Sequence, residues 1–188
     1  FKNIEGVILW KRDKNVYVNP IWNDFMEYFT MNEQYDRLII MNSDLTLQKD
    51  WDKILKIRWE MRPGEIIVPQ ISDDKTIMYQ EQDLNFALYR QIYDGIMGVF
   101  ITMNQRQTKL VFPIPANEGE IKVWFGDTWI YSLLVYLGEK VVVPGNFFAF
   151  HHHSTSVSTI PGVFDQIEKD KKAWEKIVNP KMLEKFKE

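Results

Sequence analysis

Three adjacent polar residues, Asn42, Ser43 and Asp44, come directly after the apolar segment at residues 37–41. In open α/β sheets, ligands bind beyond the carboxyl ends of the strands. A carboxylate in that place can hold Mg²⁺ or Mn²⁺, because both prefer oxygen ligands and often bridge a carboxylate to substrate phosphates. Asn, Ser and Asp are also favoured turn residues. The segment therefore predicts either a cation site at Asp44 or a simple turn.

A second carboxylate, Asp127, follows Gly126 in the aromatic segment WFGDTW at residues 124–129. A general base needs a carboxylate at the mouth of a pocket, within reach of the hydroxyl that it deprotonates. Asp is also a preferred residue at the N-cap of a helix, and a helix is predicted to begin here. The two roles are compatible, so Asp127 is a candidate base and a candidate cap.

The three histidines of the chain stand together as His151, His152 and His153. If the strand predicted at residues 147–153 continues through them, His151 and His153 share one face and His152 lies on the other. Two imidazoles on one face can bind a metal ion or donate to a phosphate. The alternative is a surface cluster, or histidines that are hydrogen-bonded in the interior.

Composition narrows the classes of function. A net charge of -3 disfavours a general nucleic-acid binder, and the absence of cysteine excludes a disulfide framework, a thiolate nucleophile and a cysteine-based zinc site. No apolar run reaches the roughly 18 residues of a membrane span, and no signal peptide is visible, so we expect a cytoplasmic protein. Aromatic residues make up 14% of the chain, so Trp124 and Trp129 could form either a sugar platform or part of the core.

Segments of extended and helical pattern alternate, which predicts an α/β fold. We expect Asn19 to cap a helix that begins at Pro20, Asp127 to cap a helix that ends at Gly138, and residues 104–107 to form a turn. The C-terminal tail is predicted to be an amphipathic helix with a solvated face, broken at Asn179-Pro180. Strands are expected at residues 4–10, 37–41, 65–69, 98–103, 141–143 and 147–153, further helices at 49–62 and 164–187, a short extended piece at 110–115, and a hairpin or a helix within 71–93.

Taken in order, these pieces resemble the inverting family 2-like glycosyltransferases of the GT-A fold, over roughly residues 15–160. The segment YDRLIIMNSD resembles the strand that ends in the family's acidic metal-binding motif. FGDTW resembles the motif at the start of the catalytic helix, whose Asp acts as base. The other matching segments are NVYVNPIWNDF after Asn15, LTLQKDW after Asp44, GVFIT from Gly98 on the acceptor side, and VVVP with the histidines near the metal and diphosphate.

The sequence also departs from the family. Asn42 stands where many members have an acidic residue, and Gly126 stands where an acidic residue often precedes the catalytic Asp. The family's first strand and its turn, which hold the nucleotide base, have no counterpart before Phe1. Either they lie upstream in a longer protein, or the chain is a reduced or non-catalytic variant. Residues 1–160 are expected to form one GT-A-like domain, a mixed Rossmann-like sheet flanked by helices, with residues 161–188 as a helical extension packed on it.

The resemblance implies a nucleotide-diphosphate sugar donor, an acceptor hydroxyl, a divalent metal (Mn²⁺ or Mg²⁺) and inversion at the anomeric carbon. Asp127 is then the catalytic base, and Asp44, His151 and His153 are the metal ligands. Donor and acceptor contacts are assigned to Asn42, Ser43, Gly98, Trp124, Gly126 and Trp129. A glycan is the expected acceptor, and the acidic balance disfavours nucleic acid. The alternatives are a non-catalytic glycan- or protein-binding module on the same fold and a metal-dependent phosphoesterase or nucleotidyltransferase.

Overall fold

The computed structural model describes residues 13, 16–72, 75–79, 89–91, 100–152 and 160–185. Within these residues the chain is a mixed α/β protein, which confirms the predicted α/β class. Its α-helices are α1 (Val18–Met31), α2 (Trp51–Met61), α3 (Gln105–Val111), α4 (Gly126–Tyr136), α5 (Val163–Ala173) and α6 (Asn179–Lys185). Its strands are β1 (Arg37–Met41), β2 (Leu45–Leu47), β3 (Ile66–Ile67), β4 (Gln70–Ile71), β5 (Tyr89–Gln91), β6 (Phe100–Asn104), β7 (Val141–Pro144) and β8 (Phe148–His151). The strand expected at residues 4–10 lies outside the described residues.

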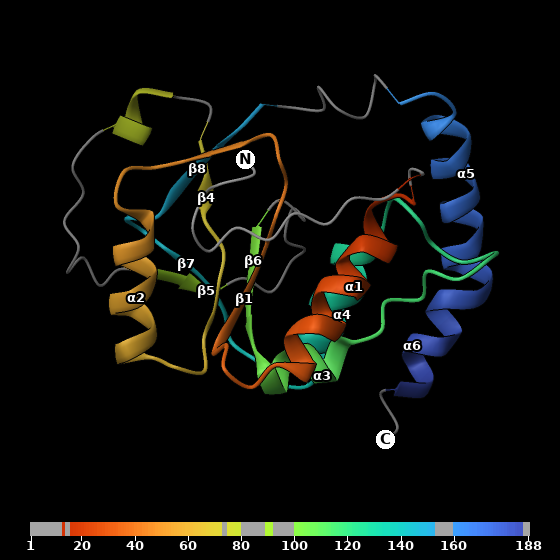
Figure 1. Ribbon diagram of the computed structural model, residues 1–188, viewed down its shortest axis with the longest axis horizontal. Helices are drawn as coiled ribbons and strands as arrows, with labels where there is room; N and C mark the ends of the chain where they lie inside the picture. The colour runs from red at the N-terminus through yellow and green to blue at the C-terminus, as the bar shows by residue number, and fades with distance from the viewer. Residues whose placement is uncertain are drawn as a thin grey trace.

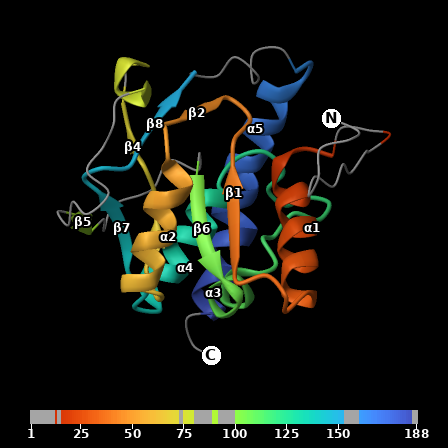
Figure 2. The same ribbon diagram turned by 60° about the vertical axis from the view of Figure 1, so that its left-hand side comes forward.

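The strands form three small sheets, and two of them lie against each other. β1 pairs antiparallel with β6, and both views show these strands side by side (Figures 1 and 2). β7 pairs in parallel with β3 and antiparallel with β5. The backbone N–H of Ile67 in β3 donates to Thr102 Oγ1 in β6 at 2.8 Å, so a buried hydroxyl joins the two sheets. β2 and β4 flank β8 in the third sheet, β2 antiparallel and β4 parallel.

Helices cover the strands on both flanks of the molecule. In Figure 1, α2 lies on the left flank, while α5 and α6 lie one above the other on the right. Helix α2 buries Ile54 and Leu55 against Phe100, Val142 and Phe147. The larger core cluster includes residues of α1, α4, β1, β6 and β7, and it also takes in Ala173, Val178 and Met182 from the C-terminal segment. The C-terminal helices are therefore part of the packed core.

Two predicted helix caps are wrong. Helix α1 begins at Val18 after Tyr17, and the side chain of Asn19 donates to the carbonyl oxygen of Trp124 at 3.0 Å instead of capping its own helix. Helix α4 begins at Gly126, so its N-cap is Phe125, in the left-handed region at φ 64°. Asp127 lies inside the first turn of α4. Gly138, at φ 78°, follows the end of α4 as expected.

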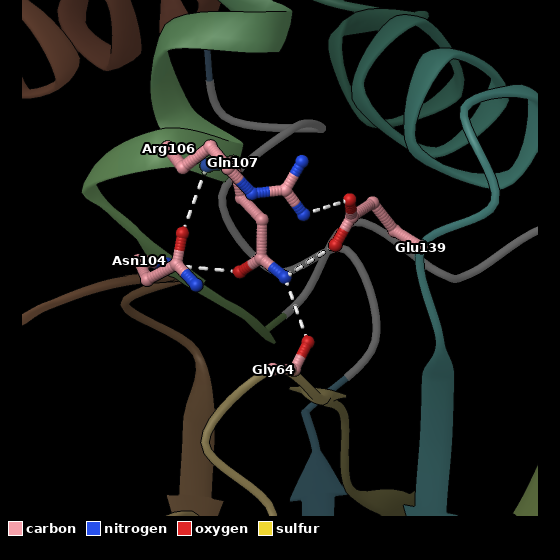
Figure 3. Close-up of polar contacts among 5 residues, drawn as sticks. All are labelled: Gly64, Asn104, Arg106, Gln107 and Glu139. Atoms are coloured by element: carbon pink, nitrogen blue, oxygen red, sulfur yellow. Dashed lines mark hydrogen bonds and ion pairs between the residues drawn. The ribbon is translucent and has the colours of Figure 1, made fainter.

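Residues 104–107, which were predicted to form a turn, begin helix α3. The N–H of Gln107 donates to Asn104 Oδ1, and Gln107 Oε1 accepts from the N–H of Asn104, which together make a capping box. Gln107 Nε2 also donates to the carbonyl oxygen of Gly64 and to Glu139 Oε2, both at 2.8 Å (Figure 3). The buried Gln107 thus ties the start of α3 to the α2–β3 and α4–β7 connections.

The C-terminal tail is helical throughout its described part, residues 163–185. The predicted break at Asn179-Pro180 does not occur, because a π-helical turn (Trp174–Val178) passes into α6 and Pro180 occupies its first turn. The π-helical turn before it keeps the helix continuous, with the N–H of Asn179 donating to the carbonyl oxygen of Trp174 five residues back. The face of α5 expected to be solvated does contain Lys169, Lys171 and Lys172, but Asp170 is fully buried.

Candidate functional site

Asp44 and His151 come into contact through the pairing of β2 with β8. Leu45 is opposite His151 in this antiparallel ladder, which places the residue before β2 next to the last residue of β8. Asp44 Oδ1 lies 3.3 Å from His151 Nε2, and the two side chains are only 12% and 14% exposed. The carbonyl oxygen of Asp44 also accepts from the N–H of His152 at 2.9 Å. The fold therefore joins two of the three predicted metal ligands, and His153 lies outside the described residues.

His152 lies on the other face of β8, as strand alternation predicts. Its Nε2 is 2.9 Å from Thr46 Oγ1, and its ring meets the ring of Phe150 edge-on at 4.9 Å. Lys75 Nζ lies 4.7 Å from the centre of the same Phe150 ring. The hydrogen bond and the ring contact fix the orientation of His152 away from the Asp44–His151 pair.

Asn42, Ser43 and Asp44 form the connection between β1 and β2, so the turn interpretation of these residues is correct. It does not compete with the cation site, because this connection is what presents the Asp44 carboxylate to His151. Gln48, which follows β2 and is buried, donates from Nε2 to the carbonyl oxygen of Asn146 at 2.9 Å. Gln48 Oε1 also accepts from the N–H of Phe148, which fixes β2 against the start of β8.

Asp127 is half-buried in the first turn of α4, and its Oδ1 accepts from the N–H of Thr128 at 2.8 Å. The positive end of the helix dipole favours a carboxylate at this position. Gly126 before it is buried and packs closely on α1. A Cβ at position 126 would lie 2.1 Å from Asn19 Oδ1, which no side chain could occupy without movement of Asn19. Gly126 therefore permits a close approach of α4 to α1.

The loop before α4 is bound by a buried carboxylate of α5. Asp170 Oδ2 accepts from three successive backbone N–H groups, those of Lys122 at 3.0 Å, Val123 at 2.6 Å and Trp124 at 2.9 Å. Asp170 Oδ1 accepts from Gln166 Nε2 at 2.8 Å. The same loop contacts α1, because the N–H of Asn19 donates to the carbonyl oxygen of Lys122 at 2.9 Å.

The two tryptophans beside Asp127 have different environments. Trp129 is 2% exposed, and its Nε1 donates to the carbonyl oxygen of Val111 at 2.8 Å. Its ring therefore belongs to the core, and the expectation that it contacts donor or acceptor is not supported. Trp124 is 48% exposed, so its ring is available for stacking. Between them, Phe125 stacks on Trp174 with ring centres 5.0 Å apart and planes at 19°.

Asp44 and Asp127 lie toward the same end of the molecule. Helix α4 ends at Tyr136, shortly before Glu139. Glu139 accepts from Gln107, which follows the end of β6, and the end of β6 pairs with the beginning of β1. Helix α4 and strand β1 are both about 16 Å long, given their residue counts and the rise per residue. In Figure 1 the start of α4 and the carboxyl end of β1 accordingly both lie above the Gln107 contacts. Gly98 lies outside the described residues.

Comparisons with known proteins assign no family. The sequence matches no protein-family model, and a comparison with curated proteins found no match. In the ranges that the structure describes, no group of three or more His, Asp or Glu side chains is arranged to hold a metal ion. Among the same residues, no helix is both long and apolar enough to traverse a bilayer.

Sequence reasoning missed Asp170 and Asn19, the two polar residues that hold the loop before α4. A signal for Asp170 was present. Val163, Ile167 and Asp170 recur at helical spacing, and all three are buried, so Asp170 occupies the apolar stripe of an otherwise charged helix. The hydrogen bond of Asn19 had no local signal, because its partner Trp124 lies 105 residues away in the chain.

Proposed function

We propose that this chain is a nucleotide-sugar-dependent glycosyltransferase of GT-A-like fold that transfers a sugar to an acceptor hydroxyl with inversion. The observation that carries the proposal is the contact between Asp44 and His151 at the carboxyl end of β1. Asp127 lies in the first turn of α4, which starts toward the same side of the molecule. The order of these three residues along the chain is the order of the family motifs that they resemble.

The residues present fit a divalent cation. Ligands at right angles on a Mg²⁺ or Mn²⁺ ion, with bonds of about 2.1 Å, lie about 3 Å apart, and Asp44 Oδ1 and His151 Nε2 are 3.3 Å apart. A carboxylate oxygen suits Mg²⁺ or Mn²⁺, and an imidazole nitrogen is a common ligand of transition-metal ions. Such ions commonly keep several waters and take further oxygens from substrate phosphates, so two protein ligands suffice. When bound, the cation would neutralise charge on the leaving diphosphate.

Asp127 supplies the base in this mechanism. Its carboxylate takes the proton from the acceptor hydroxyl as the hydroxyl oxygen forms a bond to the anomeric carbon. The bond from that carbon to the diphosphate oxygen breaks, and the diphosphate leaves with the electron pair. Because attack and departure occur on opposite faces, the configuration inverts. The half-buried position of Asp127 in the first turn of α4 leaves it partly accessible for this role.

Trp124 is the residue best placed to hold a sugar ring. Its side chain is 48% exposed, while its backbone N–H and carbonyl are bound by Asp170 and Asn19. A rigid backbone under an exposed indole lowers the entropy lost when a sugar stacks on the ring. Trp124 precedes Asp127 by three residues, so an acceptor on this ring would lie near the base.

The test is a thermal-shift and turnover screen of uridine- and guanosine-diphosphate sugars, each with and without Mn²⁺. A ligand that binds only the native state must raise the unfolding temperature. We expect at least one donor to stabilise the protein only when Mn²⁺ is present, and to be turned over when an acceptor sugar is added. In Asp44→Asn the Mn²⁺-dependent shift should disappear.

The matched control is Asp36→Asn, which removes an exposed carboxylate next to the opposite end of β1 and should leave the shift intact. Stabilisation without turnover would favour the non-catalytic module on the same fold. No shift with any donor, in either condition, would refute the glycosyltransferase and leave the glycan- or protein-binding module, which needs no donor. Phosphoester cleavage without sugar transfer would instead favour the phosphoesterase.

A further inference from the structure

The loop before Asp127 is fixed by residues far away in the sequence, on both sides. From α5, Asp170 accepts the three N–H groups of residues 122–124. From α1, Asn19 donates to the carbonyl oxygen of Trp124. Its side chain also packs against Gly126, where a β-carbon would collide with it. The carboxylate of Asp170 is fully buried and Asn19 is 1% exposed, so these contacts are sheltered from water. Hydrogen bonds to a charged group are roughly twice as strong as neutral ones.

The loop ends in a backbone conformation that needs such support. Phe125 has φ 64°, in the left-handed region that residues other than Gly, Asn and Asp seldom adopt. Its ring stacks on Trp174, the first residue after α5. The turn at Phe125 directs the chain into α4, so it determines where Asp127 emerges. Two contacts from the C-terminal segment, a carboxylate and an indole, thus bind the residues immediately before the base.

We propose that Asp170 is a positioning residue, which fixes the loop at residues 122–124 and through it the location of Asp127 and the exposed Trp124. The role at the reaction rests on the function proposed above, whereas the fixing of the loop does not. The C-terminal helix is then a required part of the catalytic unit. A misplacement of about 1 Å in a reacting group can cost as much as a hundredfold in rate, which gives such a residue a measurable effect.

The variant that tests this is Asp170→Asn, which keeps the shape and one acceptor oxygen but removes the charge. The matched control is Asp165→Asn, the same change at an exposed position of the same helix. By amide hydrogen exchange, Asp170→Asn should speed exchange about tenfold at residues 122–124 and in the first turn of α4, with little change in α2 and β7. Asp165→Asn should exchange like the wild type. Equal exchange in the two variants, or uniformly faster exchange throughout Asp170→Asn, would overturn the proposal.

The ratio of the effects on kcat and KM distinguishes a positioning role from a purely structural one. Asp170→Asn should lower kcat about tenfold while KM for the nucleotide sugar stays within twofold, because the donor site at Asp44 and His151 is built by other elements. An unchanged kcat beside faster loop exchange would refute positioning. If the wild type turns over no nucleotide sugar, the proposed glycosyltransferase function fails, and the exchange pattern still decides whether Asp170 holds the loop and the first turn of α4.

Discussion

At the lower end of the central strands in Figure 1, polar side chains form a hydrogen-bonded network with one another and with the backbone. Gln107 accepts from Asn104, donates back to it, and donates to Gly64 and Glu139 (Figure 3). Arg106 completes the set through its ion pair with Glu139. The contacts with Gly64 and Glu139 join the start of α3 to two other connections of the fold, and Gln107 is fully buried.

At the upper end, the acidic side chains are arranged differently. Asp44 meets His151 at 3.3 Å, longer than a strong charge-assisted hydrogen bond, and Asp127 is half-buried with one oxygen on the N–H of Thr128. The backbone around both carboxylates is fixed by other residues, among them Gln48 and Asp170. The two ends therefore differ: side chains at the lower end stabilise the connections of the fold, whereas at the upper end other residues fix the backbone that carries Asp44 and Asp127.

The largest expected effect, and the sharpest way to break this comparison, is Asp127→Asn. Loss of a general base should lower kcat by about 10²- to 10⁴-fold. The free energy of unfolding should fall by less than about 1 kcal/mol, because only a charge near a helix N-terminus is lost. Steady-state turnover of the donor found by the thermal-shift screen and urea unfolding measure the two quantities. Turnover near the wild-type rate would remove Asp127 from the role of base.

At the lower end the opposite pattern is expected for Gln107→Ala. This change leaves the N–H of Asn104 and the carbonyl oxygen of Gly64 without their partner, which should cost about 3 kcal/mol in the free energy of unfolding. Arg106→Ala is the control, because Arg106 also contacts Glu139 but is 66% exposed, and the loss there should stay below about 1 kcal/mol. Both variants should keep the Mn²⁺-dependent donor shift. A lost shift at unchanged stability would contradict the division between the two ends.

The smallest expected effect is the pH dependence contributed by Glu120, which ties the loop after α3 to α6. Burial alone would raise the pKa of Glu120, but hydrogen bonds from Lys181 and from the N–H of Asn117 favour its ionised form and lower the pKa overall. A lowered pKa adds stability that is present above the unfolded-state value of about 4.3 and is lost as the pH falls through the folded-state pKa.

Urea unfolding of wild type and Glu120→Gln at pH 6, 4 and 3 checks this. The wild type should be more stable at pH 6 by less than about 1 kcal/mol, since Lys181 is half exposed, and the difference should shrink toward pH 3. A difference that grows as the pH falls would show that the sign assigned to Glu120 is wrong.

Where the sequence has a clear local boundary, the elements could be predicted. The bounds of β1 agree with the expected strand, because an apolar run ends abruptly at Asn42. Helices α2 and α4 differ from their expected bounds by one or two residues. The capping box could have been predicted from the three-residue spacing of Asn104 and Gln107, but the segment was interpreted as a turn.

The candidate site could be predicted only as separate residues. Nothing local relates Asp44 to His151, because their contact requires the pairing of β2 with β8 across most of the chain. The cap expected at Asn19 was wrong for a related reason: its side chain bonds a loop far away in the sequence, because tertiary contacts outweigh a local preference of about 1 kcal/mol. Asp127 still makes a local contact, with the N–H of Thr128, but α4 begins one residue earlier, at Gly126.

The close approach of Gly126 to Asn19 has a consequence for how this sequence can diverge. A β-carbon at position 126 would lie 2.1 Å from the amide oxygen of Asn19, so an acidic residue in front of Asp127 requires the Asn19 side chain to move or to be replaced. We therefore expect positions 19 and 126 to covary, with a smaller residue at 19 accompanying a side chain at 126. A homologue that has Asn at position 19 and a bulky residue at position 126 would require a different placement of α4 relative to α1.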